Sequence, residues 1–148
     1  MRPRPVPRIP AVIRDALLPV LRERFPGRGL REGAPPGPVA VFPPAHPEVG
    51  PVEIYDDGDE VSIFVGTITH LHIGPWTAGP EPVECTPEAM AEDVASFLED
   101  LFADRTLLWR SASGSGGSLP REGECPLTLL GPGDETFVWS GPVPNPRG

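Results

Sequence analysis

The sequence predicts one α+β domain, in which two amphipathic helices pack on an antiparallel sheet of about five or six strands. Apolar residues recur at helical spacing in two segments, about 10–25 and 87–103, as expected for helices with one buried face. Short runs of β-branched and aromatic residues lie between and after these segments, separated by turn-forming residues. The order of the elements favours an antiparallel sheet with both helices on one face. The length of 148 residues suits one domain, 1–148.

The first helix is expected to follow an extended arm. Four prolines in MRPRPVPRIP exclude a helix, so residues 1–9 should be polyproline-like. Pro19 lies inside the helix that follows and should kink or split it, because proline removes a backbone donor. The segment PGRGLREGAPPGP at 26–38 is typical of a loop.

A hairpin is the clearest local prediction for the sheet. The run VAVF at 39–42 has strand composition, and so do 52–56 and 60–73. Asp57 and Gly58 supply the backbone conformations of a tight turn. The strands 52–56 and 60–73 should therefore be antiparallel neighbours.

The second helix carries its own start signals. Thr86 can cap it, Pro87 fits its first position, and acidic residues follow near the positive end of its dipole. Its apolar stripe consists of Met90, Val94, Phe97, Leu98, Leu101 and Phe102.

The last third of the chain should add strands to the same sheet. TLLWRS at 106–111 is expected to be a strand, and SGSGGS begins a predicted flexible loop over 113–126. LTLL at 127–130 and TFVWS at 136–140 predict two more strands. The tail, 141–148, should be irregular.

Charge indicates the kind of partner. The net charge is −9, and it is unevenly distributed: eight arginines and three acids give +5 in 1–38, whereas four arginines and eighteen acids give −14 in 39–148. The two segments should attract each other. The acidic balance argues against unspecific binding to nucleic acid or to anionic membranes and suits a basic protein partner. The expected docking residues are Asp56, Asp57, Asp59, Glu60, Trp76, Glu92 and Asp93.

Lysine and cysteine limit the possible chemistry and the cellular compartment of the protein. Lysine is absent, which excludes a P-loop lysine and a Schiff-base lysine. The only two cysteines, Cys85 and Cys125, are expected to be free thiols in a reducing compartment. No apolar run is long enough to cross a bilayer, and with the thiols this predicts a cytoplasmic protein. Abundant arginine, proline, alanine and glycine suggest a GC-rich bacterial genome.

His70 and His72 are the candidate metal ligands. Residues two apart on a strand point to one face, so both imidazoles could meet zinc, iron or copper. The sequence alone does not identify the further ligands, for which the candidates are His46, Glu84, Cys85 and Cys125. A structural role, acid/base chemistry and partner contact stay open for this pair.

Three other motifs favour structural roles. Cys85 precedes an acidic helix whose dipole could lower its pKa, but no base is assigned beside it. The acidic run at 56–60 is too short for a calcium loop and is explained by the hairpin turn. SGSGGS lacks the lysine of a phosphate-binding loop. Trp109 and Trp139 should be core residues, whereas Trp76 should be an exposed contact.

The segments EIYDDGDEVSIFVGTITHLHIG and EDVASFLEDLFADRTLLWRS resemble an uncharacterised family of small bacterial proteins. Its members have a strand ending Thr-His-x-His and a helix ending Phe-Leu-Glu-Asp-Leu-Phe-Ala-Asp. The resemblance covers roughly 52–111, implies that this segment is the core unit, and implies no activity. A glycine often stands between the histidines in that family, where this chain has Leu71.

Two functional hypotheses follow. The first is a non-catalytic binding or inhibitory protein, of the immunity type, that docks a basic partner. The second is a small metal-dependent enzyme in which His70 and His72 hold an ion that activates water. No catalytic residue is assigned.

Overall fold

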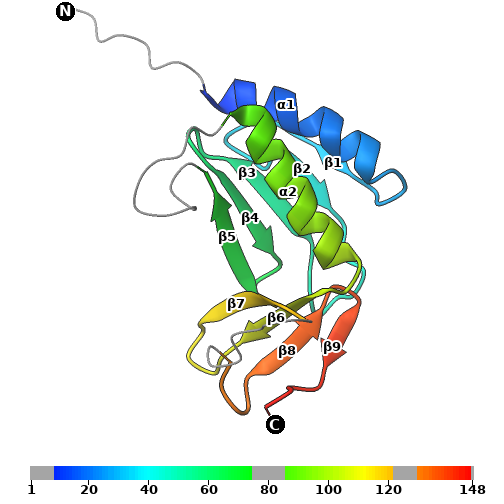
Figure 1. The fold of residues 1–148 in the computed structure, drawn as a ribbon, viewed down its shortest axis with the longest axis vertical. Coiled ribbons are helices and arrows are strands. Elements are labelled where there is room, and N and C mark those ends of the chain that lie inside the picture. Colours follow the sequence, from blue (N-terminus) through cyan, green and yellow to red (C-terminus); the bar gives the residue numbers. More distant parts are fainter. Residues whose placement is uncertain (1–8, 75–85, 122–129, 148) are drawn as a thin grey trace, which may run out of the picture.

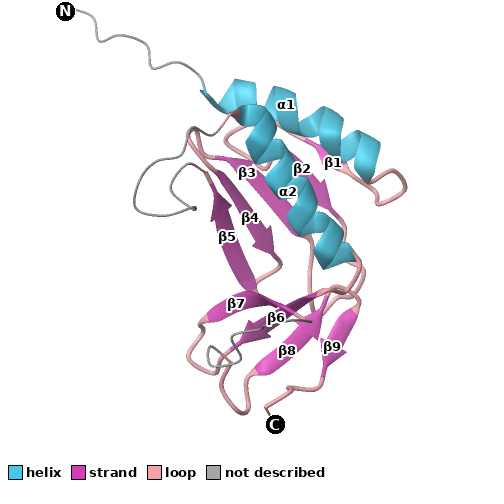
Figure 2. Ribbon diagram, in the orientation of Figure 1, coloured by secondary structure: helices cyan, strands magenta, loops and turns pink. Residues whose placement is uncertain are grey.

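Two helices and two antiparallel sheets make up the computed structural model, which describes residues 9–74, 86–121 and 130–147 (Figures 1 and 2). The predicted α+β class is confirmed, and the first sheet has the expected five strands, but the strands of the last third form a second sheet and do not extend the first. The helices are α1 (Ile9–Arg24) and α2 (Pro87–Phe102). The first sheet has the order β1 (Arg31–Glu32), β2 (Ala40–Phe42), β3 (Val52–Asp56), β4 (Val61–Val65), β5 (Thr69–Ile73). The second has the order β7 (Gly116–Pro120), β6 (Thr106–Arg110), β8 (Glu135–Val138), β9 (Gly141–Val143).

Both helices cover the same face of the first sheet (Figure 2). Val52 and Ile54 of β3 are fully buried, whereas the alternate residues Glu53 and Tyr55 are only half-buried. This period of two is that of a sheet with one face on the core. The opposite face of this sheet, called here the outer face, therefore carries the side chains that remain accessible.

An aromatic cluster joins the helices to both sheets. The Phe102 ring lies 5.3 Å from Phe25, 5.2 Å from Phe42 and 5.1 Å from Trp139, measured between ring centroids. These residues come from the ends of α1 and α2, from β2 and from the turn between β8 and β9. One buried cluster thus joins the two sheets, and Trp139 belongs to it as predicted. Trp109, also predicted as a core residue, is only partly buried and packs against a second, smaller cluster.

The hairpin prediction is confirmed for β3 and β4, but the expected long strand at 60–73 is wrong. It folds back on itself as β4 and β5, which pair antiparallel with Val65 opposite Thr69. Gly66 makes the turn with φ +53°, and a Cβ there would lie 1.9 Å from the carbonyl oxygen of Val49. Only glycine fits this backbone conformation and this close approach.

The glycine-rich loop expected at 113–126 is wrong over residues 116–120, which form β7, while residues 122–126 lie outside the described residues. A Cβ on Gly116 would lie 2.0 Å from the carbonyl oxygen of Ile68, and one on Gly117 would lie 2.7 Å from the indole nitrogen of Trp109. The glycines therefore let this strand pack closely against the β4–β5 turn and under an aromatic ring. The glycines of this segment thus serve close packing and not flexibility.

Several boundaries differ from the predictions. Pro19 lies inside α1, yet α1 stays one helix and is not split. The loop expected at 26–38 contains the short strand β1, and the tail expected at 141–148 contains β9. These two short strands pair with β2 and β8, so a tertiary partner gives them order that their composition does not predict. Arm residues 1–8 and most of the strand expected at 127–130 lie outside the described residues.

The second helix begins as its sequence predicts. Thr86 is the N-cap, and its hydroxyl accepts a hydrogen bond of 3.1 Å from a backbone N–H of the first turn. Pro87 follows at the first position, and the predicted stripe faces the core. Neither α1 nor α2, the helices that the structure describes, is long and apolar enough to span a membrane.

Candidate functional site

A row of four rings crosses the outer face of the first sheet. Tyr55 of β3 lies 5.5 Å from Phe64 of β4, Phe64 stacks on His70 of β5 at 5.3 Å, and His70 meets the edge of His72 at 5.3 Å. The two histidines and Phe64 are exposed. The predicted common orientation of His70 and His72 is confirmed.

The strand register explains this row. Phe64 pairs with His70, and Ser62 pairs with both His72 and Tyr55. Residues directly opposite in antiparallel strands hold their side chains on one face at about 5 Å. Because β4 follows β3 through a tight turn and β5 follows β4 through another, one continuous stretch of chain supplies the whole face.

A shallow depression of about 320 Å³ lies on this face beside the rings. Its lining is acidic and aromatic at once, consisting of Glu53, Tyr55, Asp57, Ser62, Phe64 and Gly66. The Tyr55 hydroxyl donates a 3.1 Å hydrogen bond to the Glu53 carboxylate. Carboxylates beside aromatic faces form an environment suited to a cation.

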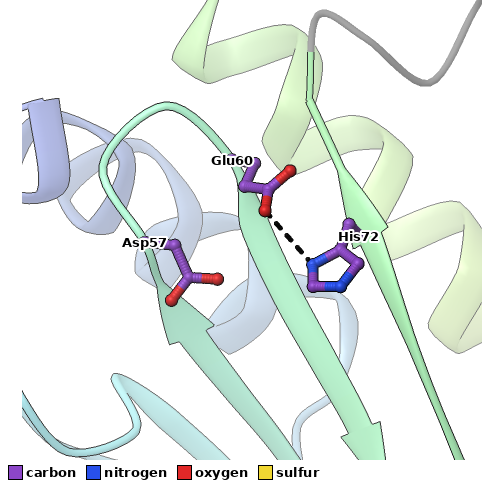
Figure 3. A group of neighbouring side chains, drawn as sticks. All are labelled: Asp57, Glu60 and His72. Carbon is purple, nitrogen blue, oxygen red and sulfur yellow. Dashed lines mark ion pairs between the residues drawn. The ribbon is translucent and has the colours of Figure 1, made fainter.

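Three potential metal ligands converge at the turn end of the same face. One oxygen each of Asp57 and Glu60 and one ring nitrogen of His72 lie within 4.8 Å of one another (Figure 3). The Nδ1 atom of His72 is 3.3 Å from a carboxylate oxygen of Glu60. Asp57 follows β3, Glu60 precedes β4 and His72 lies on β5, so the hairpin turn and the strand pairing together assemble this acid–histidine group.

The hydroxyl of Ser62 contacts two members of this group, Asp57 and His72. It donates to the Asp57 carboxylate and lies 2.8 Å from His72 Nδ1. A hydroxyl has one proton, so a second hydrogen bond between Ser62 and His72 needs the proton on Nδ1. This differs from a catalytic triad, in which the imidazole bridges the serine and the acid through its two nitrogens. Ser62 is also only 3% exposed, which shields it from a substrate.

Asp56 behaves differently from its acidic neighbours. It accepts a 3.1 Å hydrogen bond from the backbone N–H of Gly58, and its second carboxylate oxygen is buried near the backbone of Arg14. Burial raises the pKa of Asp56 to about 6, and the adjacent Asp57 charge acts in the same direction. Asp56 is therefore less available to a partner than Asp57 and Asp59, which are exposed.

The predicted histidine pair does not form one site with a third ligand among the described residues. His72 joins Asp57 and Glu60, whereas His70 stacks on Phe64. His46, a predicted further ligand, has its ring beside Gly141 of the second sheet. The other predicted ligands Glu84, Cys85 and Cys125, and the contact residue Trp76, lie outside the described residues.

The two predicted acidic patches belong to different layers of the fold. Glu92 and Asp93 lie on α2, and α2 covers the inner face of the sheet (Figure 1). Asp57 and Glu60 instead border the outer face, beside His72. Arg24 of α1 forms ion pairs with Glu92 and with Glu99, the latter at 3.1 Å. The predicted attraction between the basic start of the chain and its acidic remainder thus takes place at α2.

Sequence reasoning missed the residues between the histidines and the acids. Glu53, Tyr55, Ser62 and Phe64 were assigned only to strands. Their signal is the period of two in β3 and β4, where polar or aromatic residues alternate with valine and isoleucine. The alternation places them on the face opposite the helices, together with His70 and His72.

Comparisons with protein-family models, with curated proteins and with solved structures found no match for this chain. The resemblance to a family of small bacterial proteins therefore stays a prediction.

Proposed function

We propose that this protein is a non-catalytic binding protein that docks a basic protein partner on the outer face of its first sheet. The observation that carries the proposal is Phe64. It is the one large hydrophobic side chain that is exposed among the described residues, at 36%, and it lies in the acidic depression. An inhibitory protein of the immunity type, acting on a basic toxin in the cytoplasm, would be one instance.

The chemistry of the depression supports an arginine or lysine side chain as the inserted group. A guanidinium can stack on the face of Phe64 or Tyr55 while its N–H groups donate to a carboxylate. Glu53 and Asp57 supply such carboxylates. Aromatic anchors surrounded by charged groups are typical of the residues that dominate protein–protein affinity.

The charge distribution supports a basic partner independently. Every arginine ion pair between described residues engages an acid outside this face, namely Glu32, Glu92, Glu99, Asp100 or Glu135. No arginine among the described residues thus forms an ion pair with Glu53, Asp57 or Asp59, and these carboxylates are open to an incoming cation. Complementary charge chiefly speeds association and sets specificity, so the on-rate should fall as salt rises.

The experiment uses an arginine-rich peptide and a peptide of equal length with citrulline in place of arginine. We expect the arginine peptide to bind and the citrulline peptide to bind at least tenfold more weakly. Asp57→Asn should weaken binding about two- to fivefold, the equivalent of roughly 0.5–1 kcal/mol for one exposed charge contact.

Asp93→Asn is the matched control, because it removes the same charge from an exposed position on the helical layer. Equal weakening by Asp57→Asn and Asp93→Asn would mean that only the net charge matters. Equal binding of the two peptides would contradict recognition of a cation altogether.

The competing hypothesis of a metal-dependent enzyme requires His70 and His72 on one ion. Stacking of His70 on Phe64 supports a role in the ring row instead. An outer face that binds peptide and has no metal-dependent activity would favour the docking hypothesis.

A further inference from the structure

We infer that Asp57, Glu60 and His72 form a binding site for a zinc-class transition metal ion. This site does not rest on the proposed docking function, although it shares the Asp57 carboxylate with the docking face. The ligand set combines one imidazole with two carboxylates, a mixture that zinc accepts in sites with three protein ligands and an open fourth position. The ligands are thus His72 and two carboxylates, in place of the predicted pair of His70 and His72.

The distance between His72 and Glu60 fits such an ion, and Asp57 lies near enough to join it. Zinc binds nitrogen and oxygen at about 2.1 Å, which places tetrahedral ligands about 3.4 Å apart. His72 Nδ1 and the Glu60 oxygen are already 3.3 Å apart, and no pair in the group exceeds 4.8 Å. Small side-chain rotations would shorten the other ligand-to-ligand distances. Such rotations are open to these side chains, because those of His72 and Glu60 are 44% and 33% exposed and Asp57 is exposed.

The surroundings favour an ion over further ion pairs. Two carboxylates face one imidazole, and within 9–74, 86–121 and 130–147 no arginine forms an ion pair with Asp57 or Glu60. The buried Ser62 hydroxyl donates to Asp57 and would orient that carboxylate, as outer-shell hydrogen bonds do in metal sites. A metal ion bound through Nδ1 would replace the contact that this nitrogen makes with the Ser62 hydroxyl.

The site is accessible to solvent. Asp57 and His72 are both exposed, so the open coordination position would face solvent. An imidazole among the ligands favours zinc, copper or nickel over magnesium and calcium, which prefer oxygen alone.

The test is a titration of the full, untagged, chelator-treated chain with Zn²⁺ by calorimetry, and with Co²⁺ by visible absorption. We expect one Zn²⁺ per chain and Co²⁺ bands typical of four-coordination. His72→Ala should weaken Zn²⁺ binding by more than the ten- to hundredfold that loss of an outer-shell residue costs. Glu60→Gln should weaken it in the same direction.

His70→Ala is the matched control, because His70 is also exposed and lies two residues away on the same face of β5. It should bind Zn²⁺ as the unchanged protein does. Thermal melting of both metal-free variants would show that they fold. No Zn²⁺ binding by the unchanged chain, undiminished binding by His72→Ala, equal loss in His70→Ala, or binding of Ca²⁺ in preference to Zn²⁺ would each overturn the site.

Discussion

Replacing Asp56 by asparagine should stabilise the protein at neutral and alkaline pH. The Asp56 carboxylate is half-buried beside Asp57, and burial outweighs the backbone N–H groups of Gly58 and Arg14 that favour its charged form. Burial raises its pKa from 3.8 to about 6, which means that the folded state disfavours the charged form. Asparagine removes the charge and keeps an oxygen that can accept from the N–H of Gly58.

The magnitude follows from the pKa. A tenfold change in proton affinity corresponds to about 1.4 kcal/mol, so the charged carboxylate destabilises the fold by at most about 3 kcal/mol above pH 6. Solvent reaches part of this side chain and screens the charge, and we therefore expect a gain of about 1–2 kcal/mol in the free energy of unfolding. The sign follows from protonation. The native state binds the proton more tightly, so stability from this group falls as pH rises from about 4 to 6.

The assay is urea denaturation of the unchanged protein and Asp56→Asn at pH 3.5, 5 and 7.5, with a chelator present. The two proteins should differ most at pH 7.5 and least at pH 3.5, where Asp56 is protonated in the folded chain and mostly protonated in the unfolded chain. Asp59→Asn, on an exposed neighbour, should change stability by less than about 0.5 kcal/mol. A difference that is independent of pH, or a loss of stability in Asp56→Asn, would refute this reasoning.

Three further substitutions test the packing and the outer face by urea or thermal unfolding. Gly117→Ala should lower the free energy of unfolding by about 1–3 kcal/mol, because its Cβ would lie 2.7 Å from the Trp109 indole. The control Gly37→Ala should be tolerated, because the nearest atom to its Cβ would be 3.5 Å away. Similar stabilities of the two variants would contradict this packing. Thr86→Ala should cost about 1 kcal/mol through loss of the helix cap, and an unchanged unfolding midpoint would count against that cap. Phe64→Ala should change stability by less than about 1 kcal/mol while abolishing peptide binding, and a larger loss of stability would make Phe64 a core residue.

The elements that the sequence predicted well are those with local causes. The stripe, the cap and the first proline of α2 lie within one segment, and so does the turn between β3 and β4. The failures at Gly66 and Gly117 have a tertiary cause, because what requires glycine there is a carbonyl oxygen or an indole ring from elsewhere in the chain. A glycine in a strand pattern signals close approach without naming the partner.

The candidate site shows the same division. Alternation along β5 predicted that His70 and His72 share a face. Their partners depend on register, which pairs Phe64 with His70 and Ser62 with His72. A strand expected to run straight through 60–73 could not bring Asp57 and Glu60 beside His72, whereas the turn at Gly66 does.

The most direct test of the docking proposal is a heteronuclear NMR titration of the isotope-labelled chain with the arginine-rich peptide. The account predicts that backbone amide shifts concentrate on Glu53, Tyr55, Asp57, Phe64 and His70, and that they vanish with the citrulline peptide. Shifts concentrated on the exposed side of α2, or no shifts at any peptide concentration, would contradict the outer face as the docking surface.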